Sequence, residues 1–220
     1  MSQPRLYDDH VHSHFSIDGH DSVLALCQAA TENGLAGLAI TDHFDTEPSD
    51  PGYGTYDFDR LRLAVEQARA VYGGELAILV GAEVCFQPAY ARRVADFLRA
   101  CPLDFVLGSA HYARGEFVDP AYCARHSAAE AYARYFEAVE AVVASGLFDS
   151  LAHFDLAKRY ATGVHGPFDP APHWPRIERI LRLLIERDMA LEINASGWRQ
   201  AKKESREALG RSSRRTRRNR

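Results

Sequence analysis

The sequence predicts an α/β protein built on a parallel sheet. Short apolar segments rich in β-formers alternate with longer segments of helical periodicity, a pattern typical of β/α units. The 220 residues suffice for one substantial core, so we expect one domain over residues 1–198 and a basic tail over residues 199–220. The expected strands are Leu6–His10, Gly37–Thr41, Leu76–Glu83, Phe105–Ala110, Ser150–His153 and Ala190–Asn194.

Helical periodicity fills the intervals between these strands. An apolar stripe with spacings of three and four runs from Tyr132 to Val143, and a second stripe over Ile177–Ile185 follows Pro175. Further helices are expected over residues 21–33 and 57–72, each of which is followed by glycine. The helices therefore alternate with the strands, as an α/β fold requires.

Charge is divided unevenly along the chain. Residues 1–197 carry 16 Lys and Arg and 28 Asp and Glu. Residues 198–220 carry ten Lys and Arg and only two Glu. An acidic body argues against a nucleic-acid-binding domain, because phosphates are neutralised by a basic face, and only the tail could serve that purpose. No apolar run approaches the roughly 20 residues of a membrane helix, and the first residues lack the apolar core of a signal peptide. A cytoplasmic protein without a membrane partner is expected.

Side chains that ligate metals stand at the carboxyl ends of the predicted strands. These ends share one edge of a parallel sheet, so we expect the side chains to converge. Imidazole nitrogens and carboxylates suit zinc, iron or manganese, and together they predict a polynuclear metal site. The residues are His10, His12, Asp42, His43, Glu83, His111 and His153.

Glu83 is the most informative of them. It lies in the otherwise apolar segment 80–84, where a carboxylate is costly to bury unless it is paired or bound to a metal. Each histidine taken alone has a structural explanation as a satisfied core residue or a polar strand end, and Asp42 could cap a backbone donor in a turn. The ordered set favours ligands over these alternatives.

In their order along the chain, these motifs resemble the PHP (polymerase and histidinol phosphatase) superfamily, and within it the histidinol-phosphate phosphatases. The resemblance covers residues 6–198 and implies a distorted (β/α)7-type barrel that holds two or three divalent ions at the carboxyl ends of its strands. The motifs are His10-Val-His12, Thr41-Asp-His43, the Glu83 strand, Ser109-Ala-His111, His153-Phe-Asp155 and Glu192-Ile-Asn194.

The resemblance also implies how the ligands are shared among the ions. The matches are His10, His12 and Glu83 for one ion, Glu83, His111 and His153 for a second, and His43 with Asp18 for a third. Glu83 would then bridge two ions. His20 is kept as a reserve ligand, while His126, His165 and His173 are expected to be surface or loop residues.

The chemistry implied is phosphate ester hydrolysis, because clustered cations lower the pKa of bound water toward 7 and neutralise phosphoryl oxygens. Arg159 is the first choice and Lys158 the second for binding the substrate phosphate, with a solvated helix or loop as the alternative explanation. Asp155 is expected to orient a ligand or to protonate the leaving alkoxide.

The chain departs from the family pattern after residue 198. The pattern continues with a seventh strand and a Gly-Ser-Asp-Ala-His motif that supplies an Asp and a His ligand, but residues 199–220 contain neither Asp nor His. We therefore expect the barrel to lack its seventh strand and two ion positions to lose one ligand each. The two explanations are a shifted reading frame or altered gene end, and a genuine basic tail that binds an acidic partner or nucleic acid.

These observations favour an enzyme that hydrolyses the small-molecule phosphomonoester L-histidinol phosphate to L-histidinol and phosphate in histidine biosynthesis. Two alternatives stay open. One is a phosphoesterase of the same type with another phosphomonoester or a nucleotide as substrate. The other is a degenerate metal-binding protein with little activity.

Overall fold

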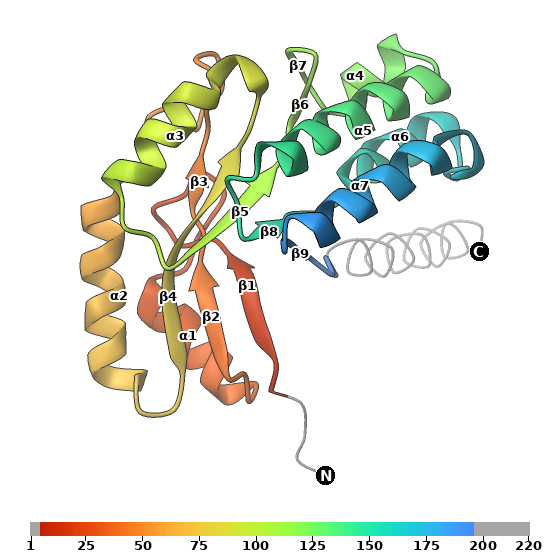
Figure 1. Ribbon diagram of the computed structural model, residues 1–220. Helices are drawn as coiled ribbons and strands as arrows, with labels where there is room; N and C mark the ends of the chain where they lie inside the picture. The colour runs from red at the N-terminus through yellow and green to blue at the C-terminus, as the bar shows by residue number, and fades with distance from the viewer. Residues whose placement is uncertain (1–4, 196–220) are drawn as a thin grey trace, which may run out of the picture.

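The computed structural model describes residues 5–195, which form a curled parallel half-barrel sheet flanked by helices (Figure 1). Six strands follow one path across the sheet, and the two-residue strand β3 pairs with β4 beside that path. The order is β1 (Tyr7–Val11), β2 (Gly37–Ile40), β4 (Ala77–Cys85), β5 (Phe105–Ser109), β8 (Ser150–Leu151) and β9 (Ala190–Leu191), with β3 at His43–Phe44. The predicted α/β class and all six predicted strands are confirmed.

The sheet is open between β1 and β9. Over residues 5–195 these two strands are its edges, and each pairs with one neighbour, β1 with β2 and β9 with β8. The tail expected at residues 199–220 lies outside the described residues. Two short strands, β6 (Tyr112–Ala113) and β7 (Glu116–Phe117), form a separate antiparallel hairpin that the sequence did not predict, because two residues carry no periodicity.

The helices begin and end on local signals in the sequence. Asp57 accepts a hydrogen bond from the amide of Arg60 at the start of α2, and Ser127 accepts one from Glu130 at the start of α5. Gly146 ends α5 with a φ of 65°, which favours glycine. The helices are α1 (Val23–Glu32), α2 (Phe58–Tyr72), α3 (Ala91–Ala100), α4 (Pro120–Arg125), α5 (Ala128–Ser145), α6 (Leu156–His165) and α7 (Trp174–Glu186), with 3-10 turns at Pro88–Tyr90 and Ala171–His173.

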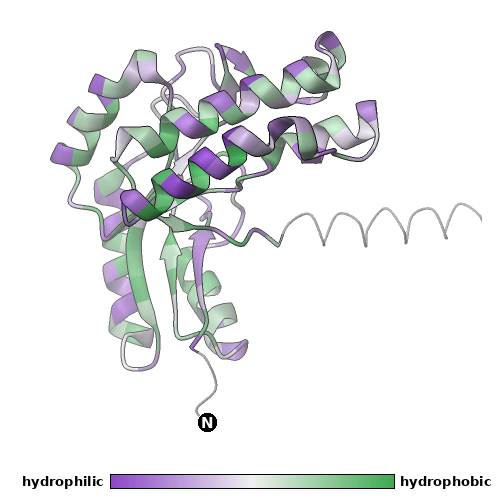
Figure 2. Cartoon of the chain, turned by 45° about the vertical axis from the view of Figure 1, so that its right-hand side comes forward, coloured by the Kyte–Doolittle hydropathy of each residue, from purple (hydrophilic) through white to green (hydrophobic). Residues whose placement is uncertain are grey.

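Two apolar clusters form the core. One packs α1 and α2 against β2 and the first half of β4, and the other packs α5 and α7 against β5 and β8 (Figure 1). In Figure 2 the central strands are green, whereas the helices alternate green and purple, as amphipathic helices do. His173, in the 3-10 turn between α6 and α7, packs against Phe136 and Phe168 with 8% of its surface exposed. Of the two expectations for it, surface or loop residue, the first is wrong.

The parallel arrangement sets the place of the functional residues. Strands β1, β3, β4, β5 and β8 all run in the same direction, so their carboxyl ends lie along one edge of the sheet. Residues 5–195 contain no helix that combines the length and apolar character needed to cross a membrane.

Candidate metal centre

Glu83, near the end of β4, is the centre of the candidate site. Its side chain is 1% exposed, and its two carboxylate oxygens face different groups of histidines. The register of the sheet brings one of these histidines close, because His43 in β3 is the direct parallel partner of Glu83 in β4. A buried carboxylate among so many imidazoles is an arrangement that needs compensating charge.

One oxygen of Glu83, Oε2, faces the histidines of β1 and β3. It lies 3.2 Å from His10 Nε2, 3.2 Å from His12 Nε2 and 3.4 Å from His43 Nδ1. The nitrogens of His12 and His43 named here are buried, yet neither makes a hydrogen bond. Such unpaired buried nitrogens cost free energy. A cation among these three rings would satisfy them, so the residues fit a metal ion.

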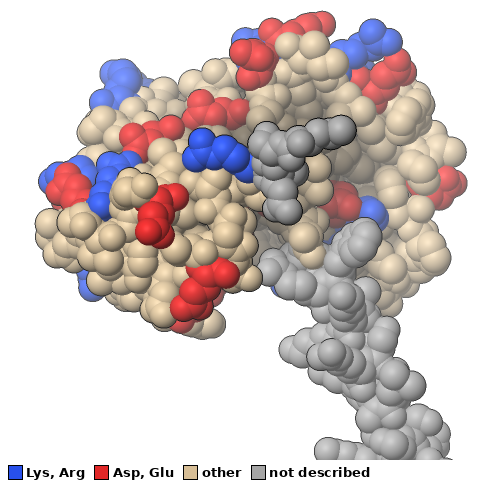
Figure 3. Space-filling model, turned by 90° about the horizontal axis from the view of Figure 1, so that it is seen from below, with Lys and Arg blue, Asp and Glu red and all other residues tan. Residues whose placement is uncertain are grey.

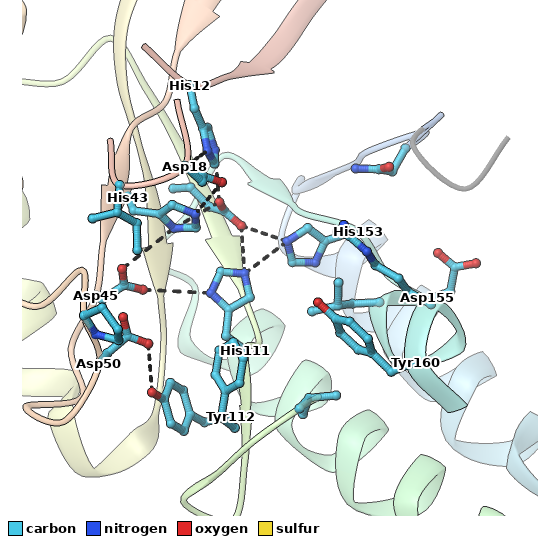
Figure 4. A pocket seen from close by; sticks show the side chains of 18 of the residues that line it. His12, Asp18, His43, Asp45, Asp50, His111, Tyr112, His153, Asp155 and Tyr160 are labelled. Carbon is cyan, nitrogen blue, oxygen red and sulfur yellow. Dashed lines mark hydrogen bonds and ion pairs between the residues drawn. The ribbon is translucent and has the colours of Figure 1, made fainter. Parts of the chain in front are cut away.

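The other oxygen, Oε1, faces the histidines that follow β5 and β8. It lies 3.2 Å from His111 Nε2 and 2.8 Å from His153 Nε2. The two rings also lie close to each other, with 3.3 Å between their Nε2 atoms. Glu83 therefore stands between two separate nitrogen sets, as a carboxylate that bridges two ions would. Figure 4 shows the imidazoles of His12, His43, His111 and His153 converging on this place.

The pKa values reflect this crowding. Burial alone would raise the pKa of Glu83, but the charges of His10 and His111 hold it well below its ordinary value. Burial alone would lower the pKa of His10 and His12, but Glu83 and their second carboxylate partners raise these pKa values to about 10 and about 9. For His153 burial dominates, and its pKa is lowered. Protons on His10 and His12 thus occupy positions that a divalent cation would take over, since metal ligands bind deprotonated.

Donor atoms within 4.8 Å of one another define four groups in the described residues. They are His10, His12 and Glu83; Glu83, His111 and His153; His12, Asp18 and His43; and His43, Asp45 and His111. The first two match the predicted ligands of two ions. In the third, Asp18 Oδ1 lies 2.8 Å from His12 Nδ1 and Oδ2 lies 3.4 Å from His43 Nε2. The structure therefore brings together the seven ligands that the family resemblance implies, Asp18 among them. The reserve ligand His20 is exposed and belongs to none of the four groups.

Asp45 is a residue that the sequence analysis missed. It is 3% exposed, and its two oxygens lie 3.9 Å from His43 Nδ1 and 3.9 Å from His111 Nδ1. Asp45 thus places a buried carboxylate beside two of the predicted ligands and completes the fourth group.

Asp42 has the structural role that the sequence left open for it. It is buried and accepts hydrogen bonds from the backbone amide of Ser13 at 2.6 Å and from the Ser13 hydroxyl at 2.7 Å. Ser13 follows His12 directly, so these bonds fix the turn that leaves β1. Asp42 thereby holds His12 and the segment that leads to Asp18 in place without facing the cluster.

A cavity of about 1580 Å³ opens above the histidines, and the residues predicted to bind phosphate line it. Asp155 precedes α6, and Lys158 and Arg159 lie in its first turn. Lys158 Nζ is 2.9 Å from Asp155 Oδ2, and the Arg159 guanidinium lies 5.6 Å from the centre of the Tyr160 ring. Figure 4 shows Asp155 apart from the converging imidazoles, so these groups form the rim of the cavity.

The surface charges do not suggest a nucleic-acid interface on the face drawn in Figure 3. Acidic and basic side chains are interspersed there rather than gathered into one basic surface. Binding to a polyanion depends on a continuous basic face.

Fold and site together define an α/β metalloprotein whose ligands stand at the carboxyl ends of parallel strands. The model of the PHP domain matches residues 8–196, and the chain belongs to this family. The family predicted from the sequence is confirmed.

Relatives within the family are similar along most of the chain. A probable histidinol-phosphatase of Deinococcus radiodurans is 29% identical over 202 residues, which cover 89% of this chain and 75% of the relative. The histidinol-phosphatase of Lactococcus lactis is 26% identical over 195 residues, which cover 85% of this chain and 70% of the relative. A crystal structure of histidinol phosphate phosphatase from Lactococcus lactis, complexed with zinc, L-histidinol and phosphate, superposes with a TM-score of 0.80 at 25% identity, covering 86% of this chain and 73% of that one.

Proposed function

We propose that this chain is a metal-dependent phosphomonoesterase that hydrolyses L-histidinol phosphate to L-histidinol and phosphate. The observation that carries the proposal is the buried Glu83 carboxylate, which faces one set of histidines with each oxygen at the base of an open cavity. The similar chain crystallised with zinc, L-histidinol and phosphate supports the choice of substrate.

We assign the ions to the following groups of side chains. His10, His12 and Glu83 would hold one ion, Glu83 with His111 and His153 a second, and Asp18 with His43 a third. Zinc, iron and manganese all suit these donors. When bound, two or three divalent ions supply positive charge for the phosphoryl oxygens and a hydrolytic water at neutral pH.

The rim residues would serve the ester itself. The guanidinium of Arg159 suits two phosphate oxygens at once, and Lys158 adds a second positive charge beside it. As water attacks phosphorus, the bond from phosphorus to the histidinol oxygen breaks, and the leaving alkoxide needs a proton. We assign Asp155, which lies 2.9 Å from Lys158 on the same rim, to take up the proton that the attacking water releases and to pass it to the alkoxide.

The proposed function also implies where the protein acts in the cell. An enzyme of histidine biosynthesis acts in the cytoplasm, which cell fractionation checks. We propose that residues 1–198 form the catalytic domain and residues 199–220 a basic tail. Removal of residues 199–220 from the purified chain, followed by measurement of metal content and activity, tests whether the tail contributes to the site.

Phosphate release is the test. The purified chain, loaded with Mn²⁺ or Zn²⁺, is assayed on L-histidinol phosphate, O-phosphoserine, glycerol phosphate and a nucleoside monophosphate. The proposal expects the highest kcat/KM for L-histidinol phosphate. A higher value for another ester would assign a different substrate to the same chemistry, and bound metal without any phosphate release would indicate a metal-binding protein without catalysis.

A further inference from the structure

Glu192 is a partly buried carboxylate that the proposed chemistry does not use. It follows β9 directly, and 14% of its side chain is exposed. Its Oε1 lies 3.0 Å from His10 Nδ1 and accepts a second hydrogen bond from Asn194 Nδ2 at 2.8 Å. Its Oε2 accepts a hydrogen bond from the backbone amide of His153. One side chain thus contacts a histidine from each of the two groups that share Glu83.

The contact joins the two open edges of the sheet. His10 lies at the end of β1, and Glu192 follows β9, the strand at the opposite edge. No backbone pairing links these two strands within residues 5–195. The side-chain bond from Glu192 to His10 therefore closes the half barrel at the level of the candidate metal centre, where the relative position of the edges matters most.

The bond also fixes which nitrogen of His10 carries the proton. An ionised carboxylate only accepts hydrogen bonds, so His10 donates through Nδ1–H. A cation bound beside Glu83 Oε2, which lies 3.2 Å from His10 Nε2, would then displace the proton from Nε2 and bind its lone pair. A carboxylate behind the imidazole is the usual way in which proteins orient a metal-bound histidine and raise its basicity.

The backbone of His153 needs support as well. Its φ is 20°, an uncommon value for a residue other than glycine. Two side chains hold its peptide groups: Tyr135, which is fully buried, donates its hydroxyl proton to the His153 carbonyl at 2.9 Å, and Glu192 accepts from the His153 amide. Such a conformation persists only where the surroundings determine it.

We propose that Glu192 is a positioning residue of the metal centre, which holds His10 Nδ1–H and the His153 amide at once and thereby sets the affinity of both ion positions that share Glu83. The proposal goes beyond the phosphatase function, because it concerns uptake of metal and not the choice of ester. It also explains why one carboxylate spans the open side of the sheet.

The variant that tests this proposal is Glu192→Gln. Glutamine keeps the shape of the side chain, but its one oxygen and its NH2 group cannot accept hydrogen bonds from both His10 Nδ1–H and the His153 amide. Metal-free protein is titrated with Co²⁺, followed by its visible absorption, and with Zn²⁺ against a chromophoric chelator. We expect affinity to fall about 10- to 100-fold. Glu178→Gln is the matched control, because Glu178 is an exposed carboxylate on α7 that pairs with Arg182; its affinity should equal that of the wild type.

Two results would overturn the proposal. One is a folded Glu192→Gln chain with wild-type affinity for Co²⁺ and Zn²⁺, folding being judged by the urea midpoint of the metal-free form. The other needs no variant: in the zinc-loaded, ¹⁵N-histidine-labelled wild type, His10 should carry its proton on Nδ1, and a proton on Nε2 would contradict the role. Neither measurement uses a substrate, so absence of phosphatase activity leaves both informative.

Discussion

The two ends of the cavity are built in different ways. At its base, Glu83 is 1% exposed and is surrounded by histidines that strands and strand ends hold. At its rim, Asp155 and Lys158 belong to the start of a helix, with 51% and 44% of their side chains exposed. The base is fixed by the register of the sheet, as the pairing of His43 with Glu83 shows, whereas the rim is fixed by one local ion pair in contact with water.

This difference predicts unequal consequences of change. Removing a group from the base leaves other buried charges without partners, which is costly. Removing one from the rim leaves groups that solvent can hydrate, so the protein stays folded and loses only what the group contributes to the ester.

Removal of the ions should have the largest effect, because the base then lacks the positive charge that the ions supply to the phosphoryl oxygens. We expect dialysis against a chelator to lower kcat/KM for L-histidinol phosphate by more than about 10³-fold, which is about 4 kcal/mol of transition-state stabilisation. Added Zn²⁺ or Mn²⁺ should restore it. Full activity in chelator, with metal absent by elemental analysis, would show that the base does not act through ions.

Re-addition of metal should also stabilise the fold. An ion present at 100 times its Kd stabilises a native state by about 2.7 kcal/mol, so the urea midpoint should rise with metal concentration. The urea midpoints of Arg159→Ala and of the wild type should rise by the same amount, because the rim is not expected to contact the ions. An unequal rise would break the distinction between base and rim.

Asp155→Asn should come next. Loss of a general acid costs about 10²-fold or more in kcat for an ester with a poor leaving group such as histidinol. The same change should matter little for p-nitrophenyl phosphate, whose leaving group needs no proton. An equal loss on both substrates would assign Asp155 to positioning of Lys158 rather than to proton transfer.

The phosphate-binding pair should give the smallest effects. Arg159→Ala is expected to raise KM about tenfold, because it removes a charge-assisted contact worth about 1.5 kcal/mol, while metal content stays unchanged. Lys158→Ala should have less effect, since Lys158 already pairs with Asp155 at 2.9 Å. Steady-state kinetics give the KM of each variant, and elemental analysis gives its metal content. A KM unchanged in both variants would show that Lys158 and Arg159 do not bind the phosphate.

Much of the base could be predicted from the sequence. Apolar runs located the six strands, and residues at the carboxyl ends of neighbouring parallel strands must lie near one another. The strands alone were enough to place His12, His111 and His153 near one another, because each lies within two residues of the end of its strand. The buried Glu83 was visible as a carboxylate in an apolar segment.

Asp45 and Glu192 could not be placed in the same way. Asp45 follows a strand of two residues, which has no periodicity, and its burial depends on Gly52, where an added Cβ would lie 2.1 Å from Asp45 Oδ2. Glu192 stood out as part of a motif, but its partner His10 is 182 positions away at the other edge of the sheet. Such a contact exists only after the sheet has curled.

The central claim is that one carboxylate serves two ion positions, and the metal content of Glu83→Gln tests it most directly. Wild type and variant are loaded with Zn²⁺, freed of excess ion and measured by elemental analysis, with circular dichroism confirming the fold. The account predicts at least two ions per wild-type chain and the loss of both shared ions in the folded variant. A variant that retains two ions per chain would contradict it.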